Sequence, residues 1–204
     1  MLGLVLGISF STMLYIYVSH ELSYDSFHQK ADRTFRVITL DTSTPDNTRT
    51  YGLTALPMGP QLVNSFPEVK EMVRLFRFSG QVIVEFEETK YNERNWFTTS
   101  DTNFFNVFDF EFIAGDKRTA LSEPFSVVLT ASTSKKYFSD DNPIGKMIKT
   151  GAGEVKVTGV IKDIPDNSHL QFDLLFSALR SGKDWEAALN NWQRMGAYTY
   201  VVSR

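Results

Sequence analysis

The hydrophobic pattern divides the chain into one apolar segment and a long remainder of mixed character. Residues 1–19 contain no acidic residue, basic residue or histidine, and His20 and Glu21 open the polar part. An uncharged apolar run of about eighteen residues is the usual minimum for crossing the hydrocarbon core of a bilayer. The pattern therefore predicts a transmembrane helix over residues 1–20. A buried helix of a soluble domain and an uncleaved or trimmed signal sequence are the two alternative interpretations.

Small residues recur inside this apolar segment. Gly3, Gly7 and Ser11 are spaced four apart and so share one face of a helix. Small residues at that spacing let helix backbones approach closely in lipid. We therefore expect this face to pack against another membrane helix.

The flanks of the segment favour a membrane span over a signal sequence. Tyr15 and Tyr17 lie near its polar end, where amphipathic rings favour the membrane interface. A secretory signal has basic residues before its apolar core and small residues at a cleavage site. Here the first basic residue is Lys30, and no such cleavage pattern follows the apolar run. Because the basic flank is missing, we expect the given sequence to begin inside its first membrane helix.

The remainder, residues 21–204, alternates as strands do, with short helical patterns between the strands. Residues 21–31 are compatible with a continuation of the first helix beyond the membrane. Strands are expected over 33–41, 69–78, 81–88, 92–100, 108–116, 125–130, 171–179 and 197–203, with a hairpin over 147–164. Short helices are expected within 56–69 and over 101–108, 131–138 and 184–193. The predicted class is α+β, with strand pairings left open.

Phenylalanine is the most conspicuous component of this remainder. The chain has seventeen Phe and no low-complexity tract, so we expect the rings to fill a core. Phe108, Phe110 and Phe112 alternate with polar residues and are predicted to lie on one face of a strand.

Composition excludes several classes of function. The net charge is −3 with acids and bases interspersed, whereas a nucleic-acid surface needs a clustered basic face. The absence of cysteine excludes disulfides and thiolate metal sites. No second stretch is long and apolar enough to span a membrane, so residues 21–204 are expected to form one soluble body on one side of it.

Catalytic and binding motifs fail on their spacing. The Gly-Lys pair at 145–146 resembles the end of a phosphate-binding loop, but Asp140 and Met147 stand where the loop needs glycine and a serine or threonine. His20 and His28 are eight apart, whereas a zinc-binding helix places its pair four apart. Ser168 and His169 lie among acids, but no nucleophile elbow is present. The sequence therefore predicts no catalytic residue, no metal ligand and no cofactor site.

The chain resembles the MacB/FtsX-type permeases of ABC transporters, in particular their Bacteroidota-like branch. The stretch HELSYDSFHQKADRTFRV is similar to the junction that follows the first membrane helix in that branch. DTNFFNVFDFEFIAGD, ALSEPFSVVLTASTSKKYF, NPIGK and VTGVIKDIPDNSHLQFD then resemble successive blocks of the MacB-like periplasmic core domain, in the order of the family. The resemblance covers residues 1–177, and residues 178–204 match loosely. Ser139 stands where the family often has glycine.

The resemblance implies an extracytoplasmic domain inserted between the first and second membrane helices of an inner-membrane permease. Residues 21–204 would then lie in the periplasm, as a mixed α/β lobe with an inserted lobe of mostly β structure. ATP would be bound by a separate ABC ATPase subunit or domain. The other implied partners are the remaining permease spans, as a dimer, and a periplasmic adaptor or outer-membrane protein.

On this basis we expect the chain to couple ATP-driven motion to export or to an outer partner. The candidate coupling residues lie where the helix meets the domain: Glu21, Tyr24, Asp25, Phe27, His28 and Arg33. Structural capping is the alternative role for these residues. At the level of the whole chain, the alternatives are a membrane-anchored ligand-binding or sensor domain and a tethered hydrolase, and no residue constellation supports the hydrolase.

Overall fold

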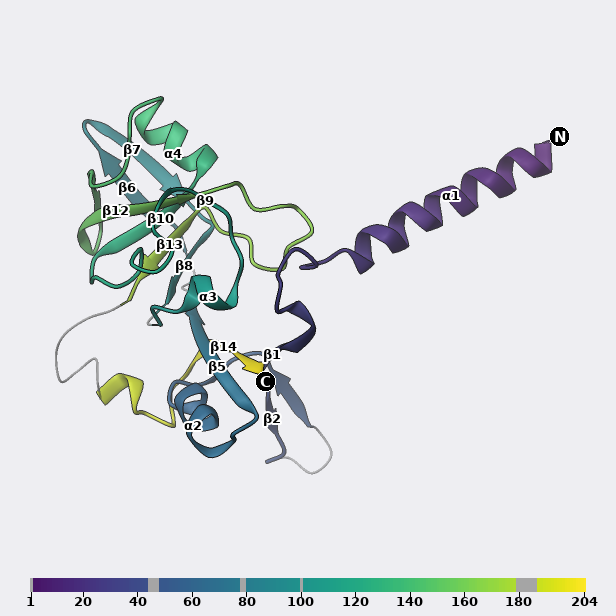
Figure 1. The fold of residues 1–204 in the computed structure, drawn as a ribbon, viewed down its shortest axis with the longest axis horizontal. Coiled ribbons are helices and arrows are strands. Elements are labelled where there is room, and N and C mark those ends of the chain that lie inside the picture. Colours follow the sequence, from purple (N-terminus) through teal and green to yellow (C-terminus); the bar gives the residue numbers. More distant parts are fainter. Residues whose placement is uncertain (1, 44–47, 78–79, 100, 179–186) are drawn as a thin grey trace.

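The apolar segment forms a helix that stands apart from the rest of the protein. The computed structural model describes residues 2–43, 48–77, 80–99, 101–178 and 187–204. Helix α1 (Leu2–Leu22) projects away from the folded body (Figure 1). The part from Gly3 to Leu22 has a mean hydropathy of 1.3, and none of it is buried in the structure. The interpretation as a buried core helix is therefore wrong, and by length and composition the helix can cross a membrane.

Helix α1 ends earlier than the sequence suggested. It stops at Leu22, residues 23–30 form successive turns, and a short 3-10 helix η1 (Ala31–Arg33) follows. The hydroxyl groups of Ser23 and Ser26 each donate to the carbonyl three residues earlier, at 2.7 and 2.8 Å. Asp25 has a φ of 55°, which an α-helix does not permit. The expected continuation of the helix through residues 21–31 is therefore wrong, because local side-chain bonds and a left-handed residue compete with it.

The folded body is mixed α/β, which confirms the predicted class. Its further labelled helices are α2 (Met58–Ser65), α3 (Phe104–Val107) and α4 (Ala131–Phe138), and among the described residues 187–189 are helical as well. The first seven strands are β1 (Thr34–Arg36), β2 (Thr39–Asp41), β3 (Arg49–Tyr51), β4 (Thr54–Ala55), β5 (Val69–Phe76), β6 (Val82–Phe86) and β7 (Thr89–Glu93). The others are β8 (Trp96–Thr99), β9 (Phe112–Gly115), β10 (Ser126–Thr130), β11 (Met147–Thr150), β12 (Gly153–Ile161), β13 (Leu174–Ser177) and β14 (Met195–Ser203).

One twelve-stranded sheet runs through the whole body. Its order is β1-β14-β5-β8-β13-β10-β12-β11-β6-β7, with β4 beside β14 and β9 beside β12. Among the strands of the described residues, only the pairs β8–β13 and β10–β12 are parallel. The strands β2 and β3 form a separate hairpin. Figure 1 shows the sheet passing from a lower part around β14, β5 and α2 to an upper part that carries α4.

Most predicted strands exist, but their limits differ. The stretches 33–41 and 92–100 are each broken, so that they contribute to two strands instead of one. Strand β9 begins only at Phe112, yet Phe108 and Phe110 are buried as expected. Of the predicted helix 184–193, residues 184–186 lie outside the described part of the chain, and 187–189 are helical. Ser139 ends α4 with a φ of 55°, which explains the preference for glycine there.

Two large clusters of buried apolar side chains hold the body together. The first cluster fills the space around α3 and includes Phe104, Phe105, Phe108, Phe110 and Phe172. The second cluster lies under α4 and includes Val84, Leu129, Tyr137, Phe138, Val155, Leu174 and Phe176. Phe27, from the segment after α1, packs against the first cluster. The chain leaving α1 is therefore attached directly to one of the two cores.

Candidate functional site

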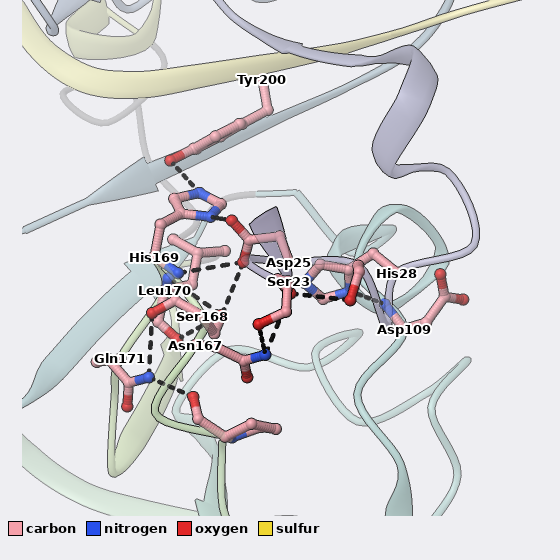
Figure 2. A network of polar contacts seen from close by, with 12 residues as sticks. Ser23, Asp25, His28, Asp109, Asn167, Ser168, His169, Leu170, Gln171 and Tyr200 are labelled. Carbon is pink, nitrogen blue, oxygen red and sulfur yellow. Dashed lines mark hydrogen bonds and ion pairs between the residues drawn. The ribbon is translucent and has the colours of Figure 1, made fainter. Parts of the chain in front are cut away.

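The residues between α1 and η1 form the best-defined polar network in the described chain. We call residues 23–30 the exit segment, and the region where it meets the domain the junction. The exit segment bonds to the loop 165–171 and to the loop around Asp109, and His169 of the first loop bonds in turn to Tyr200 on β14 (Figure 2). These parts of the domain are far from the exit segment in sequence, so the junction is a product of the tertiary fold.

Asp25 lies at the centre of the junction. Its backbone N–H donates to the carbonyl of Asn167 at 2.9 Å. Its Oδ1 accepts from the hydroxyl of Ser168 at 3.0 Å and from the backbone N–H of His169 at 3.1 Å. Its Oδ2 lies 2.6 Å from Nδ1 of His169. One carboxylate thus takes three bonds from the loop, and the positive φ of Asp25 aims it there.

His169 continues the network to the sheet. Because the Asp25 carboxylate can only accept, Nδ1 of His169 carries the proton of that bond. Nε2 lies 3.0 Å from the hydroxyl of Tyr200, on β14. Burial raises the pKa of Tyr200 to about 12, so this hydroxyl stays protonated at neutral pH and can donate to Nε2. A chain of hydrogen bonds therefore connects the exit segment to the long strand β14 (Figure 2).

A second set of bonds ties the loop 165–171 to the end of α1. The side-chain amide of Asn167 donates to the carbonyl and to the hydroxyl oxygen of Ser23, at 3.1 and 2.9 Å. The hydroxyl of Ser23 itself donates to the carbonyl of His20, at 2.7 Å. Since His20 belongs to the last turn of α1, the domain is bonded to the helix terminus through two polar side chains.

His28 fixes the other side of the exit segment. Its Nδ1 accepts from the backbone N–H of Asp109 at 3.0 Å, and the carboxylate of Asp109 accepts from the N–H of Gln29 at 2.8 Å. The ring makes edge contacts with Phe108 and Phe110 and is 6 % exposed. Burial lowers the pKa of His28, so the neutral ring is favoured. Its Nε2 is buried and has no hydrogen-bond partner among the described residues.

Lys30 anchors the end of the exit segment. Its ammonium group donates to the carbonyl of Asn106 at 2.7 Å and to the carboxylate of Glu71, on β5, at 3.2 Å. The junction therefore extends from the last turn of α1 to the region of α3 and β5. A solvent-open cavity of about 200 Å³ lies at the junction, and His28 and His169 both line it.

The burial of His28 makes the stability of the domain depend on pH. Its pKa is lower in the folded state than the ordinary value of 6.5, so below about pH 6.5 the unfolded chain binds more protons. Stability is therefore lost as the pH falls through this range, by at most about 1.4 kcal/mol per pH unit for one group. We expect His28→Asn to reduce the loss of melting temperature between pH 7.5 and 5.5, measured by circular dichroism on the full chain in detergent.

His20 provides the matched control for this prediction. It is exposed at the end of α1, so His20→Asn should leave the pH dependence as in the wild type. A pH dependence that His28→Asn does not change would show that another group carries it.

The structure places the predicted coupling residues at the junction, but not all of them in its network. Asp25 and His28 take part in hydrogen bonds, and Phe27 packs against the first core cluster. Tyr24 is exposed, with its ring edge-on to His20. The side chains of Glu21 and Arg33 have no hydrogen-bond or ion-pair partner among the described residues. A coupling role for these six residues stays a prediction.

Several residues of the junction were not singled out for coupling from sequence: Lys30, Asp109, Asn167 and Tyr200. Ser168 and His169 were considered only as a possible hydrolytic pair. Both bond to Asp25, and the second ring nitrogen of His169 faces Tyr200 instead of the hydroxyl of Ser168. A catalytic triad needs the serine on that nitrogen. Within the described ranges no cluster of three metal-ligating side chains occurs either.

The small-residue face of α1 is open within this chain. A Cβ atom added at Gly3 or Gly7 would meet nothing within 4 Å, and Ser11 is exposed. Packing of this face against another membrane helix stays a prediction.

Comparison with known proteins shows which family and which solved structures the chain is similar to. The family described as the MacB-like periplasmic core domain matches residues 1–202, beyond the 1–177 expected from sequence. A domain of a protein described as a permease, from Porphyromonas gingivalis, superposes with a TM-score of 0.71 at 21% identity, over 87% of this chain and 77% of that one. No curated protein matches the chain.

Two further solved structures are similar in fold. The periplasmic region of MacB from Actinobacillus actinomycetemcomitans has a TM-score of 0.51 at 16% identity, over 74% of this chain and 64% of that one. The extracellular domain of the noncanonic ABC-type transporter YknZ from Gram-positive bacteria has a TM-score of 0.53 at 12% identity, over 84% and 82%. At these identities the likeness concerns the fold.

Proposed function

Since the chain belongs to the family of MacB-like periplasmic core domains, the periplasmic part of ABC-type transporter permeases, we propose that it transmits ATP-driven motion of its membrane helix to that domain. The transmission would run through the junction. The family is one of transporter domains and not a typical enzyme family. Export of a substrate, or movement of an outer partner protein, would be the output.

The observation that carries this proposal is the bonding of the exit segment to the domain. The helix ends at Leu22, so a continuous helical rod is not what connects it to the domain. Instead the Asp25 carboxylate, the Asn167 amide and the His28 ring make six hydrogen bonds to partners across the junction, each between 2.6 and 3.1 Å. The three bonds to the Asp25 carboxylate involve a charged acceptor, which makes them stronger than bonds between neutral groups, so they resist separation when the helix moves.

The proposal assigns ATP to a partner. An ABC ATPase subunit or domain would bind and hydrolyse it on the cytoplasmic side of the inner membrane, and this chain would need no cofactor. The remaining permease spans, in a dimer, would surround α1. A periplasmic adaptor or outer-membrane protein would contact the domain.

We expect Gly7→Leu to weaken the association of α1 with these other spans. The leucine side chain would hold a neighbouring helix away from the small-residue face, with a loss of about 1 kcal/mol or somewhat more. Cysteine crosslinking between spans in membranes measures the association. Ile16→Ala, a change on the opposite side of the helix, is the control. Crosslinking that Gly7→Leu leaves intact would contradict the prediction.

The experiment that tests the proposed function follows the domain during hydrolysis. The chain has no cysteine, so Lys117→Cys gives one site for a fluorophore on the domain. The complete permease and its ATPase are reconstituted in lipid that carries a quencher on its headgroups. The proposal expects quenching to change between the nucleotide-free and vanadate-trapped states. A domain that keeps the same quenching in both states would contradict it and would favour a static binding domain.

A further inference from the structure

A large apolar pocket opens on the second core cluster, apart from the residues of the junction. Its volume is about 600 Å³, within the range of roughly 300–1,000 Å³ that small-molecule sites occupy. Most of the described residues that line it are apolar or small. They come mainly from β6, β8, the β11–β12 turn, β12 and β13, and include Val82, Trp96, Gly151, Ala152, Val155 and Phe176. The pocket is thus built on strands, which position ligand-binding side chains firmly.

The curvature of the sheet produces this pocket. The strands β8 and β6 are separated by four others in the sheet order, yet both line it. The indole N–H of Trp96 donates to the carbonyl of Gly80, just before β6, at 3.3 Å, and so draws the two parts together. Val155 and Phe176 belong both to the pocket wall and to the second core cluster. The pocket is therefore an opening into a hydrophobic core.

Few of the described lining residues are polar, and their charge is positive. Among the described residues that line the pocket, Arg194, just before β14, is the only charged one. Its side chain is exposed and has no ion-pair partner among the described residues. The hydroxyl of Thr98 is buried in the wall and has no hydrogen-bond partner in the described part of the chain. The unpaired guanidinium of Arg194 favours an occupant that presents an anionic oxygen to it, and the hydroxyl of Thr98 offers a further hydrogen bond in the wall.

We propose that this pocket binds an amphiphile with a long apolar chain and one anionic head group, the chemistry of a fatty acid or an acylated molecule. The chain would lie against Trp96, Val155 and Phe176, and the head would pair with Arg194. The guanidinium of Arg194, exposed and without an ion-pair partner among the described residues, favours an anionic head group over a cationic one. This proposal does not depend on the coupling role of the junction, because the two sites share no residue.

The test uses the full chain in lipid nanodiscs and a palmitate analogue with a photoreactive group at the end of its chain. We expect saturable labelling of peptides that contain Trp96 or Phe176. Palmitate and a palmitoylated acidic peptide serve as competitors, and the stronger competitor identifies the natural source of the chain. A palmityl alcohol analogue should label at least tenfold less, because it lacks the charge that Arg194 recognises.

Two variants probe the site directly. Gly151 lines the pocket, and a Cβ added there meets nothing within 4 Å, so Gly151→Trp should fill the mouth without disturbing the fold and abolish labelling. Arg194→Gln should weaken binding at least tenfold, whereas Arg118→Gln, an exposed arginine outside the pocket, should not. If Gly151→Trp melts at a lower temperature than the wild type, Ala152→Trp serves as a second variant that fills the pocket.

Labelling confined to α1, or labelling that neither filling variant reduces, would overturn the proposal. Equal labelling by the alcohol and the acid would overturn the anionic head group. Failure of this proposal would leave the displacement experiment on the domain unaffected.

Discussion

Asp25→Ala is expected to leave ATP hydrolysis by the assembled transporter intact and to remove most of the nucleotide-dependent displacement of the domain. The alanine removes the acceptor of three hydrogen bonds, from the hydroxyl of Ser168 and from the backbone and ring of His169. A bond to a charged group contributes about 1.5–3 kcal/mol. Because every 1.4 kcal/mol is tenfold in an equilibrium, detachment of the exit segment should become at least about tenfold more frequent.

The measurement is the change in headgroup quenching at position 117 alongside the ATPase rate of the same sample. Asp32→Ala is the matched control, since Asp32 is exposed and its carboxylate has no hydrogen bond or ion pair among the described residues. In the Asp32→Ala variant the nucleotide-dependent displacement of the domain should equal that of the wild type. Full displacement in Asp25→Ala would mean that the carboxylate is only a local cap.

Asp101→Ala is expected to destabilise the domain by about 3–5 kcal/mol, because it leaves a buried arginine without its counter-charge. Asp101 accepts from the Nε, Nη2 and backbone N–H of Arg74, at 3.1, 2.8 and 2.6 Å. Both side chains are less than one tenth exposed. The remaining Nη1 of Arg74 donates to the carbonyl of Leu56, at 2.9 Å. The pair therefore joins β5 to the segments before α2 and α3.

Urea unfolding of the full chain in detergent measures this loss. Asp116→Ala removes the partner of Arg118 in an exposed pair and should leave the unfolding midpoint unchanged. An Asp101→Ala variant that unfolds within about 1 kcal/mol of the wild type would show that the buried arginine finds other partners.

The fold class was predictable because it rests on local patterns. The helix α1 and the strand β10 are visible in the sequence as continuous apolar runs, and the hairpin around Gly153 as two strand patterns joined by glycines. The limits of the elements were less accessible, since they depend on side chains that compete with the backbone. Ser23, Ser26 and Asp25 end α1 in this way, although each residue alone is compatible with a helix.

Of the two sides of the candidate site, the exit segment could be predicted from sequence and its partners in the domain could not. The exit segment stands out because it follows the apolar helix directly and carries the residues of the family resemblance. The partners of the exit segment in the domain do not stand out in the sequence. Asp25 and His169 are separated by 144 positions, and Asp109 lies 81 positions from His28. No periodicity relates residues so far apart. The motif around Ser168 and His169 carried a signal of function, but its role as the hydrogen-bond donor to the Asp25 carboxylate needed the tertiary fold.

The central claim is that α1 and the domain move as one body through the junction. The most direct test is the distance between spin labels at Met13→Cys on α1 and Lys117→Cys on the domain, measured by pulsed electron resonance in the assembled transporter. The account predicts one narrow distance that is the same in the nucleotide-free and vanadate-trapped states, and a broad distribution in Asp25→Ala. A wild-type distance that differs between the two states, or an equally narrow distribution in Asp25→Ala, would contradict it.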